Sequence, residues 1–154
     1  MGVALLVLVH LGAGCSLKPV RPAVFGNEQS AAKVLIAADA SDFKGAVVKQ
    51  LVEKLVADGA FVRLAPLSDL SKLNAADYKA VVLVNTVIAW QAKPDVQAFI
   101  KRTQDRDRLI LVSTAGDPEI RTDFDGVDAV TAASEMENAG GLADEIAQKV
   151  EKLL

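Results

Sequence analysis

The chain has 154 residues, of which 51% are hydrophobic and 24% are charged, and its formal net charge is −3 at pH 7. This length and this hydrophobic fraction suit a single folded domain with a proper core, and they exclude a disordered chain. The mildly acidic balance argues against a nucleic-acid-binding surface, which would need a clear excess of Lys and Arg.

An apolar run near the N-terminus, residues 3–14, ends directly at Cys15, the only cysteine. The run is too short to span a bilayer as a helix, which takes about 20 residues, but it has the length of a signal-peptide core. With the small residues Ala13 and Gly14 before the cysteine, this segment resembles the lipobox of bacterial lipoproteins. The resemblance implies a signal peptide over residues 1–14 and a lipid on Cys15 that holds the protein at the bacterial cell envelope, facing the periplasm or the exterior. An ordinary cleaved signal peptide and a buried N-terminal strand are the alternatives.

This segment also holds the only histidine, His10. After cleavage before a lipid-linked Cys15, the mature domain would contain no imidazole and no free thiol. That excludes Ser-His-Asp hydrolysis, cysteine nucleophiles, His-ligated zinc and dithiol redox chemistry. Carboxylates, lysines, hydroxyls, Tyr78, backbone groups or a bound cofactor would remain to do chemistry. We assign no catalytic residue and no metal site, and a binding protein is favoured over an enzyme.

Residues 15–31 are predicted to form a tether, because they contain Pro19, Pro22 and Gly26 and show no apolar period. The folded domain is predicted over residues 32–154. Its first element is a strand over residues 34–38, a continuous apolar run that indicates burial on both faces.

A helix follows, capped by Ser41 and carrying apolar residues at spacings of three and four until Asp58 and Gly59 end it. Further apolar runs predict strands over residues 61–65 and 80–84. Between them, residues 66–77 leave room for one short helix at most.

The second half continues the alternation of helices and strands. A helix is predicted from Pro94, which suits a first helical turn, and strands are predicted over residues 109–112 and 127–131. The spacing of Ser134 and Glu137 predicts a capping box at the start of the last helix. The connection over residues 115–126 is also thin and is not predicted to contain a helix.

Strands that alternate with helices predict a parallel sheet covered on both faces. The expected fold is a three-layer α/β domain with a five-stranded parallel sheet and shortened connections after the second and fourth strands. The segments KVLIAADASDFKGAVVKQLVEKLVADGAFVRLAPL, DYKAVVLVNTVIAW and RLILVSTAG are similar, in this order, to the first strand-helix-strand unit, the third strand with its flavin-ring loop, and the fourth strand of flavodoxins. The resemblance covers residues 33–154 and implies a flavodoxin-like fold.

That resemblance implies an FMN site in the three loops at the carboxyl ends of the strands, where open α/β sheets bind ligands. The implied cofactor-binding residues are Ser41, Asp42, Phe43, Lys44, Asn85, Thr86, Trp90, Thr114, Ala115 and Gly116. In flavodoxins the first of these loops cradles the flavin phosphate at a helix N-terminus. Here Asp39 and Asp42 place negative charge where a dianion would bind, so Ser41 is interpreted first as a helix cap.

Two functions follow from these observations. The first is a lipid-anchored binding or scaffolding module with a degenerate flavin site, which would meet a protein partner at the envelope. The second is an electron-transfer protein in which FMN carries the electrons and the protein binds and tunes the flavin. Neither interpretation involves nucleic acid.

Overall fold

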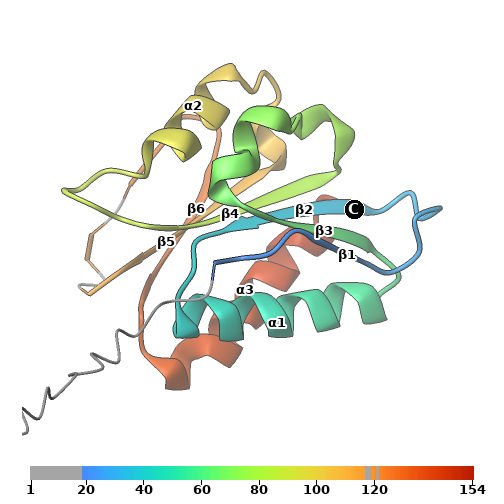
Figure 1. Ribbon diagram of the computed structural model, residues 1–154, viewed down its shortest axis with the longest axis horizontal. Coiled ribbons are helices and arrows are strands. Elements are labelled where there is room, and N and C mark those ends of the chain that lie inside the picture. Colours follow the sequence, from blue (N-terminus) through green and yellow to red (C-terminus); the bar gives the residue numbers. More distant parts are fainter. Residues whose placement is uncertain (1–18, 117–118, 121) are drawn as a thin grey trace, which may run out of the picture.

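The computed structural model describes residues 19–116, 119–120 and 122–154, and it contains one six-stranded sheet with the order β1-β3-β2-β4-β5-β6 (Figure 1). Neighbouring strands pair in parallel except at the edge, where β1 runs antiparallel to β3. Cys15 and the predicted signal peptide lie outside the described residues. The strands are β1 Ala23–Phe25, β2 Lys33–Ala38, β3 Phe61–Pro66, β4 Ala80–Thr86, β5 Leu109–Ala115 and β6 Asp128–Ala133.

The three central strands, β2, β4 and β5, are almost completely buried. Their continuous apolar runs fit this position, because a strand covered by helices on both faces has no side that faces water. Alternate residues of β2 belong to different cores: Val34 and Ile36 pack on one face of the sheet, and Leu35 and Ala37 pack on the other.

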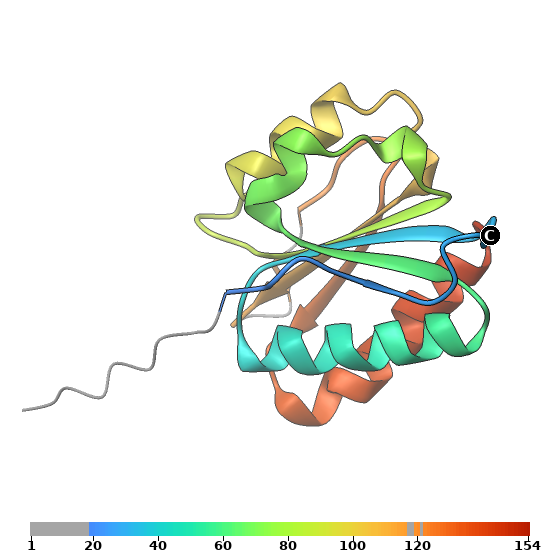
Figure 2. The same cartoon turned by 45° about the vertical axis from the view of Figure 1, so that its right-hand side comes forward.

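Helices cover both faces, in a three-layer arrangement (Figure 2). Two long helices pack against each other on one face, and one shorter helix covers the other face together with a 3₁₀ segment. The helices are α1 Asp42–Ala57, α2 Pro94–Arg102 and α3 Ala139–Glu151, and the 3₁₀ segments are η1 Leu67–Lys72, η2 Ala75–Asp77, η3 Arg106–Arg108 and η4 Met136–Asn138. Among the described residues, no helix is both long enough and apolar enough to span a membrane.

The sheet has six strands rather than the predicted five. The additional strand, β1, lies in the segment that was predicted as a tether, and Val24 of this strand pairs with Arg63 of β3. Without β1, the outer edge of β3 would present unpaired N–H and C=O groups. A segment of three residues after a proline is too short to show the pattern of a strand. β1 therefore forms because it pairs with the edge of β3, and not because of its own sequence.

The start of α1 confirms the predicted cap, because the Ser41 hydroxyl accepts the backbone N–H of Lys44 at 3.0 Å. The predicted start of the last helix at Ser134 is wrong, since α3 begins at Ala139. The Ser134 N–H donates instead to the carbonyl of Ala115 at 3.3 Å, which continues the β5–β6 pairing beyond the ends of the strands. Pairing with the sheet thus replaces the local capping pattern.

All residues of the two hydrophobic clusters lie between Val20 and Leu153. A chain of residues 16–154 therefore contains every strand, every helix and both cores described here. We expect this segment to fold by itself.

Candidate functional site

The loops that follow β2, β4 and β5 meet at the carboxyl edge of the parallel sheet. The register of the strands places these loops together, because Ala38 at the end of β2 pairs with Val84 of β4, and Thr86 at the end of β4 pairs with Thr114 of β5. The predicted site residues of all three loops therefore lie at one edge, where α/β folds bind ligands.

Asp39, the first residue after β2, joins two of these loops. One carboxylate oxygen accepts the backbone N–H of Thr86 at 3.0 Å, and the other lies 2.6 Å from the ammonium group of Lys93. The side chain of Asp39 is only 11% exposed, so the pair is shielded from solvent on the Asp39 side. We call this arrangement of Asp39, Thr86 and Lys93 the Asp39 latch.

At the N-terminus of α1 the polar groups are also engaged within the chain. The Ser41 hydroxyl accepts the Lys44 backbone N–H and also lies 3.4 Å from the Lys44 ammonium nitrogen. Phe43 is 4% exposed and belongs to the core beneath α1, so it is not part of a ligand surface. Asp42 is exposed in the first turn, where its charge favours the positive end of the helix.

Lys44 is an unusual residue in this site, because its side chain is almost completely buried. Burial lowers its pKa below the ordinary value of 10.5; the nearby Asp39 carboxylate opposes this shift, and Lys93 adds to it. Within the described residues, Lys44 makes no ion pair.

The lowered pKa of Lys44 predicts a pH dependence of stability. The unfolded chain binds more protons than the folded chain between the folded-state pKa and 10.5, so the free energy of unfolding rises with pH in that window. We expect the wild type to gain stability relative to Lys44→Met as the pH approaches 10.5. Urea denaturation of both proteins at a series of pH values measures this difference. A difference that stays constant over the whole series would contradict the prediction, and the exposed Lys101→Met change serves as the control.

Asn85 and Thr114 have structural roles in the sheet. The Asn85 side chain is fully buried; its amide nitrogen donates to the Val112 carbonyl at 3.4 Å and its oxygen accepts the Lys93 backbone N–H at 3.2 Å. The Thr114 hydroxyl is buried and donates to the Asn85 carbonyl at 3.4 Å. These groups hold β4 against β5 and fix the position of Lys93.

Trp90 lies in a tight two-residue turn. Backbone hydrogen bonds of 3.0 Å join Ile88 and Gln91 in both directions, and the central residues Ala89 and Trp90 have φ of 49° and 65°. Positive φ at both central positions is typical of a type I′ turn and costs about 1–2 kcal/mol for each non-glycine residue. The Trp90 side chain is 71% exposed, and Ile88 is 60% exposed.

The remaining predicted residues follow β5. Ala115 is buried, and its carbonyl accepts the Ser134 N–H described above, whereas Gly116 is exposed. Among the described residues, no three His, Cys, Asp or Glu side chains form a group that can hold a metal ion.

These observations test whether the edge fits the phosphate of FMN, and the fit is poor. The Ser41 hydroxyl and the Thr86 N–H already have partners within the chain, and the carboxylates of Asp39 and Asp42 would repel a dianion. A groove at this edge is lined by Ser41, Asp42 and Lys44, but not by Asn85, Trp90 or Thr114. The residues implied for the FMN phosphate and the residues implied for the flavin ring therefore do not line one common groove.

Lys93 is the site residue that the sequence did not indicate. It stands 54 positions after Asp39, and no local pattern links the two. Only the order of the strands could have indicated this pair. With β4 beside β2 in the sheet, the segment after β4 lies next to the segment after β2.

No family model matches the chain, and no curated protein matches it in sequence. In structure it is similar to an oxidoreductase from Corynebacterium diphtheriae, at 15% identity and a TM-score of 0.51 over 80% of this chain and 96% of that one. It is also similar to a flavodoxin from the domain Archaea, at 12% identity and a TM-score of 0.50 over 77% of this chain and 99% of that one. Identities this low show the fold alone. The described domain has a flavodoxin-like α/β fold, as the resemblance of its segments to flavodoxins implied.

Proposed function

We propose that this chain is a lipid-anchored binding or scaffolding module of the bacterial cell envelope, with a flavodoxin-like domain whose flavin site is degenerate. The observation that carries the proposal is the Asp39 latch. The Asp39 carboxylate accepts a hydrogen bond from the Thr86 N–H and forms an ion pair with Lys93. It lies in the loop after β2, which would have to offer free hydrogen-bond donors to a phosphate.

The exposed turn of Ile88 and Trp90 supports a role in binding another protein. Both side chains present large apolar surface at the carboxyl edge, and such surface is often part of an interface. The position at the membrane rests on the sequence around Cys15 alone.

The degenerate flavin site is tested by titrating residues 16–154 with FMN while flavin fluorescence and the visible spectrum are followed. We expect no saturable quenching up to millimolar FMN. Saturable quenching at micromolar FMN that Trp90→Ala weakens would overturn the proposal.

That outcome would instead support an electron-transfer protein, in which the bound flavin carries the electrons. One observation favours this second function: the only tryptophan is exposed beside the carboxyl ends of the strands. An aromatic side chain in this place can stack on a flat ring system.

The anchor is tested in bacteria that express the full chain with radiolabelled palmitate in the medium. We expect label on the wild type and on Ser16→Ala, and no label on Cys15→Ser. Label that persists on Cys15→Ser would show that Cys15 does not carry the lipid.

A further inference from the structure

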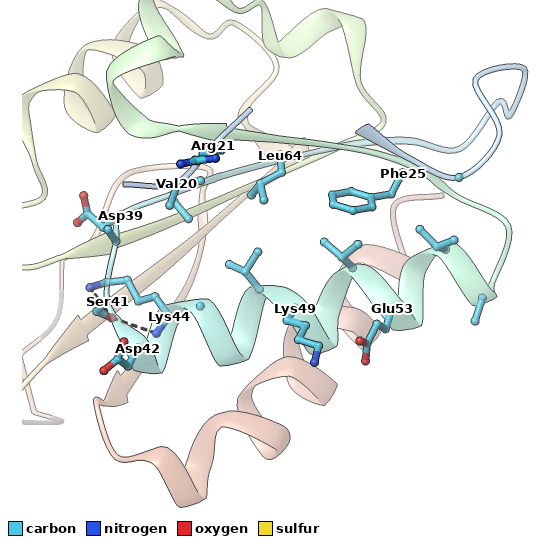
Figure 3. A pocket seen from close by; sticks show the side chains of 18 residues that line it. Val20, Arg21, Phe25, Asp39, Ser41, Asp42, Lys44, Lys49, Glu53 and Leu64 are labelled. Carbon is cyan, nitrogen blue, oxygen red and sulfur yellow. Dashed lines mark hydrogen bonds between the residues drawn. The ribbon is translucent and has the colours of Figure 1, made fainter. Parts of the chain in front are cut away.

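A groove with a volume of about 1230 Å³ lies between α1 and the outer strands of the sheet (Figure 3). Phe25 of β1 and Leu64 of β3 point toward the helix from the strand side. The charged ends of Lys49 and Glu53, which also border the groove, point away from the strands. The groove is therefore apolar along most of its length.

The helix side of the groove is a stripe of valines. Val48, Val52 and Val56 are spaced by four residues, so they lie in a row along α1. Val48 and Val52 are each 7% exposed and belong to the same core cluster as the fully buried Leu51 and Leu55, and Val56 packs against that cluster. The groove thus exists because β1 extends the sheet beyond the part that α1 covers.

One end of the groove is polar. Ser41 and Lys44 line it there, next to the first turn of α1. Lys44 is only 4% exposed, and an ammonium group has three donors. Among the described residues, the only side-chain acceptor within hydrogen-bond distance of these donors is the Ser41 hydroxyl. A buried ammonium without a carboxylate partner favours a bound anion beside it.

The charges around this end suit a single negative charge. Asp39 is balanced by Lys93, and Asp42 is exposed to solvent. Arg21 and Lys44 line the same end, so together with Lys93 there are three positive charges against the two negative charges of Asp39 and Asp42, an excess of one positive charge. A carboxylate matches this excess better than a phosphate dianion does.

We propose that the groove binds a long-chain fatty acid, with the acyl chain along the valine stripe of α1 and the carboxylate at Lys44 and Ser41. From Lys44 to Val56 the helix rises about 18 Å, which matches an extended chain of about 14 carbons. The inference depends neither on a lipid at Cys15 nor on the flavin site.

The test uses residues 16–154 and the fluorescent fatty acid cis-parinaric acid, displaced by unlabelled competitors. We expect palmitate to displace the probe at micromolar concentration, and octanoate to bind more than about a hundredfold more weakly, since each buried methylene contributes about fourfold in affinity. Lys44→Met should weaken palmitate binding at least about tenfold and leave hexadecanol binding unchanged.

A second variant tests the other end of the groove without touching the carboxylate site. Val56→Asp should weaken palmitate binding but leave octanoate binding unchanged, because the shorter chain does not reach this position. Lys101→Met, on α2 at the opposite face of the sheet, serves as the control for both variants.

Three results would overturn the proposal. The first is the absence of saturable displacement, and the second is an equal effect of Lys44→Met on palmitate and hexadecanol, which would indicate a neutral occupant such as a lipid on Cys15. The third is a dimer in sedimentation that palmitate does not dissociate, which would mean that a second copy covers the groove.

Discussion

Phe99→Ala is expected to lower the free energy of unfolding by about 3–5 kcal/mol. Phe99 is fully buried on α2, in the cluster that fills the face of the sheet opposite α1. The guanidinium group of Arg102 lies 4.7 Å from the centre of its ring and donates to the Leu70 and Leu73 carbonyls. Removing the ring leaves a cavity and also removes the surface on which Arg102 stacks.

Urea denaturation of residues 16–154 measures this loss, with the dependence on urea concentration expected to stay the same. Val24→Ala, at a side chain that is 56% exposed, is the matched control and should change stability by less than about 0.5 kcal/mol. A loss below about 1 kcal/mol for Phe99→Ala would show that α2 does not pack on the sheet as described.

The second large effect is expected at the Asp39 latch. Asp39→Ala should cost about 1–3 kcal/mol, because the Thr86 N–H loses its acceptor and Lys93 loses its counter-charge. Asp39→Asn should cost less, since an amide oxygen can still accept the Thr86 N–H.

Asp42→Ala is the control for the latch, because Asp42 is exposed and acts only through the helix dipole, a contribution of about 0.3–1 kcal/mol. Both variants are compared by urea denaturation at neutral pH. Equal losses for Asp39→Ala and Asp42→Ala would show that the latch contributes no more than an exposed charge does.

The burial of Phe99 can be predicted from the sequence, whereas the Asp39 latch cannot. The burial of Phe99 follows from its spacing with Val96 and Ile100 on a helix after a proline, which is a local pattern. The Asp39 latch cannot be predicted from a local pattern, because Asp39 and Lys93 belong to loops after different strands. Their distance depends on the position of β2 beside β4 in the sheet.

The candidate site shows the same division. Ser41 was predicted as a helix cap from residue type and position, and it caps α1. The resemblance to flavodoxins implied Asn85 and Thr114 as cofactor-binding residues, whereas in the structure their side chains form hydrogen bonds within the sheet. A sequence places a polar residue at the end of a strand, but whether its side chain points to a ligand or to a neighbouring strand depends on the partner strand.

The amino-acid sequence by itself determined the alternation of strands and helices, the parallel core of five strands and the cap of α1. Each of these depends on hydrophobic periods and capping chemistry within a few residues. Only the tertiary structure decided the pairing of β1 with β3, the Asp39–Lys93 ion pair, the burial of Lys44 and the groove along α1. The physical reason is that each of these features arises where the fold brings distant segments together, and no local pattern records that contact.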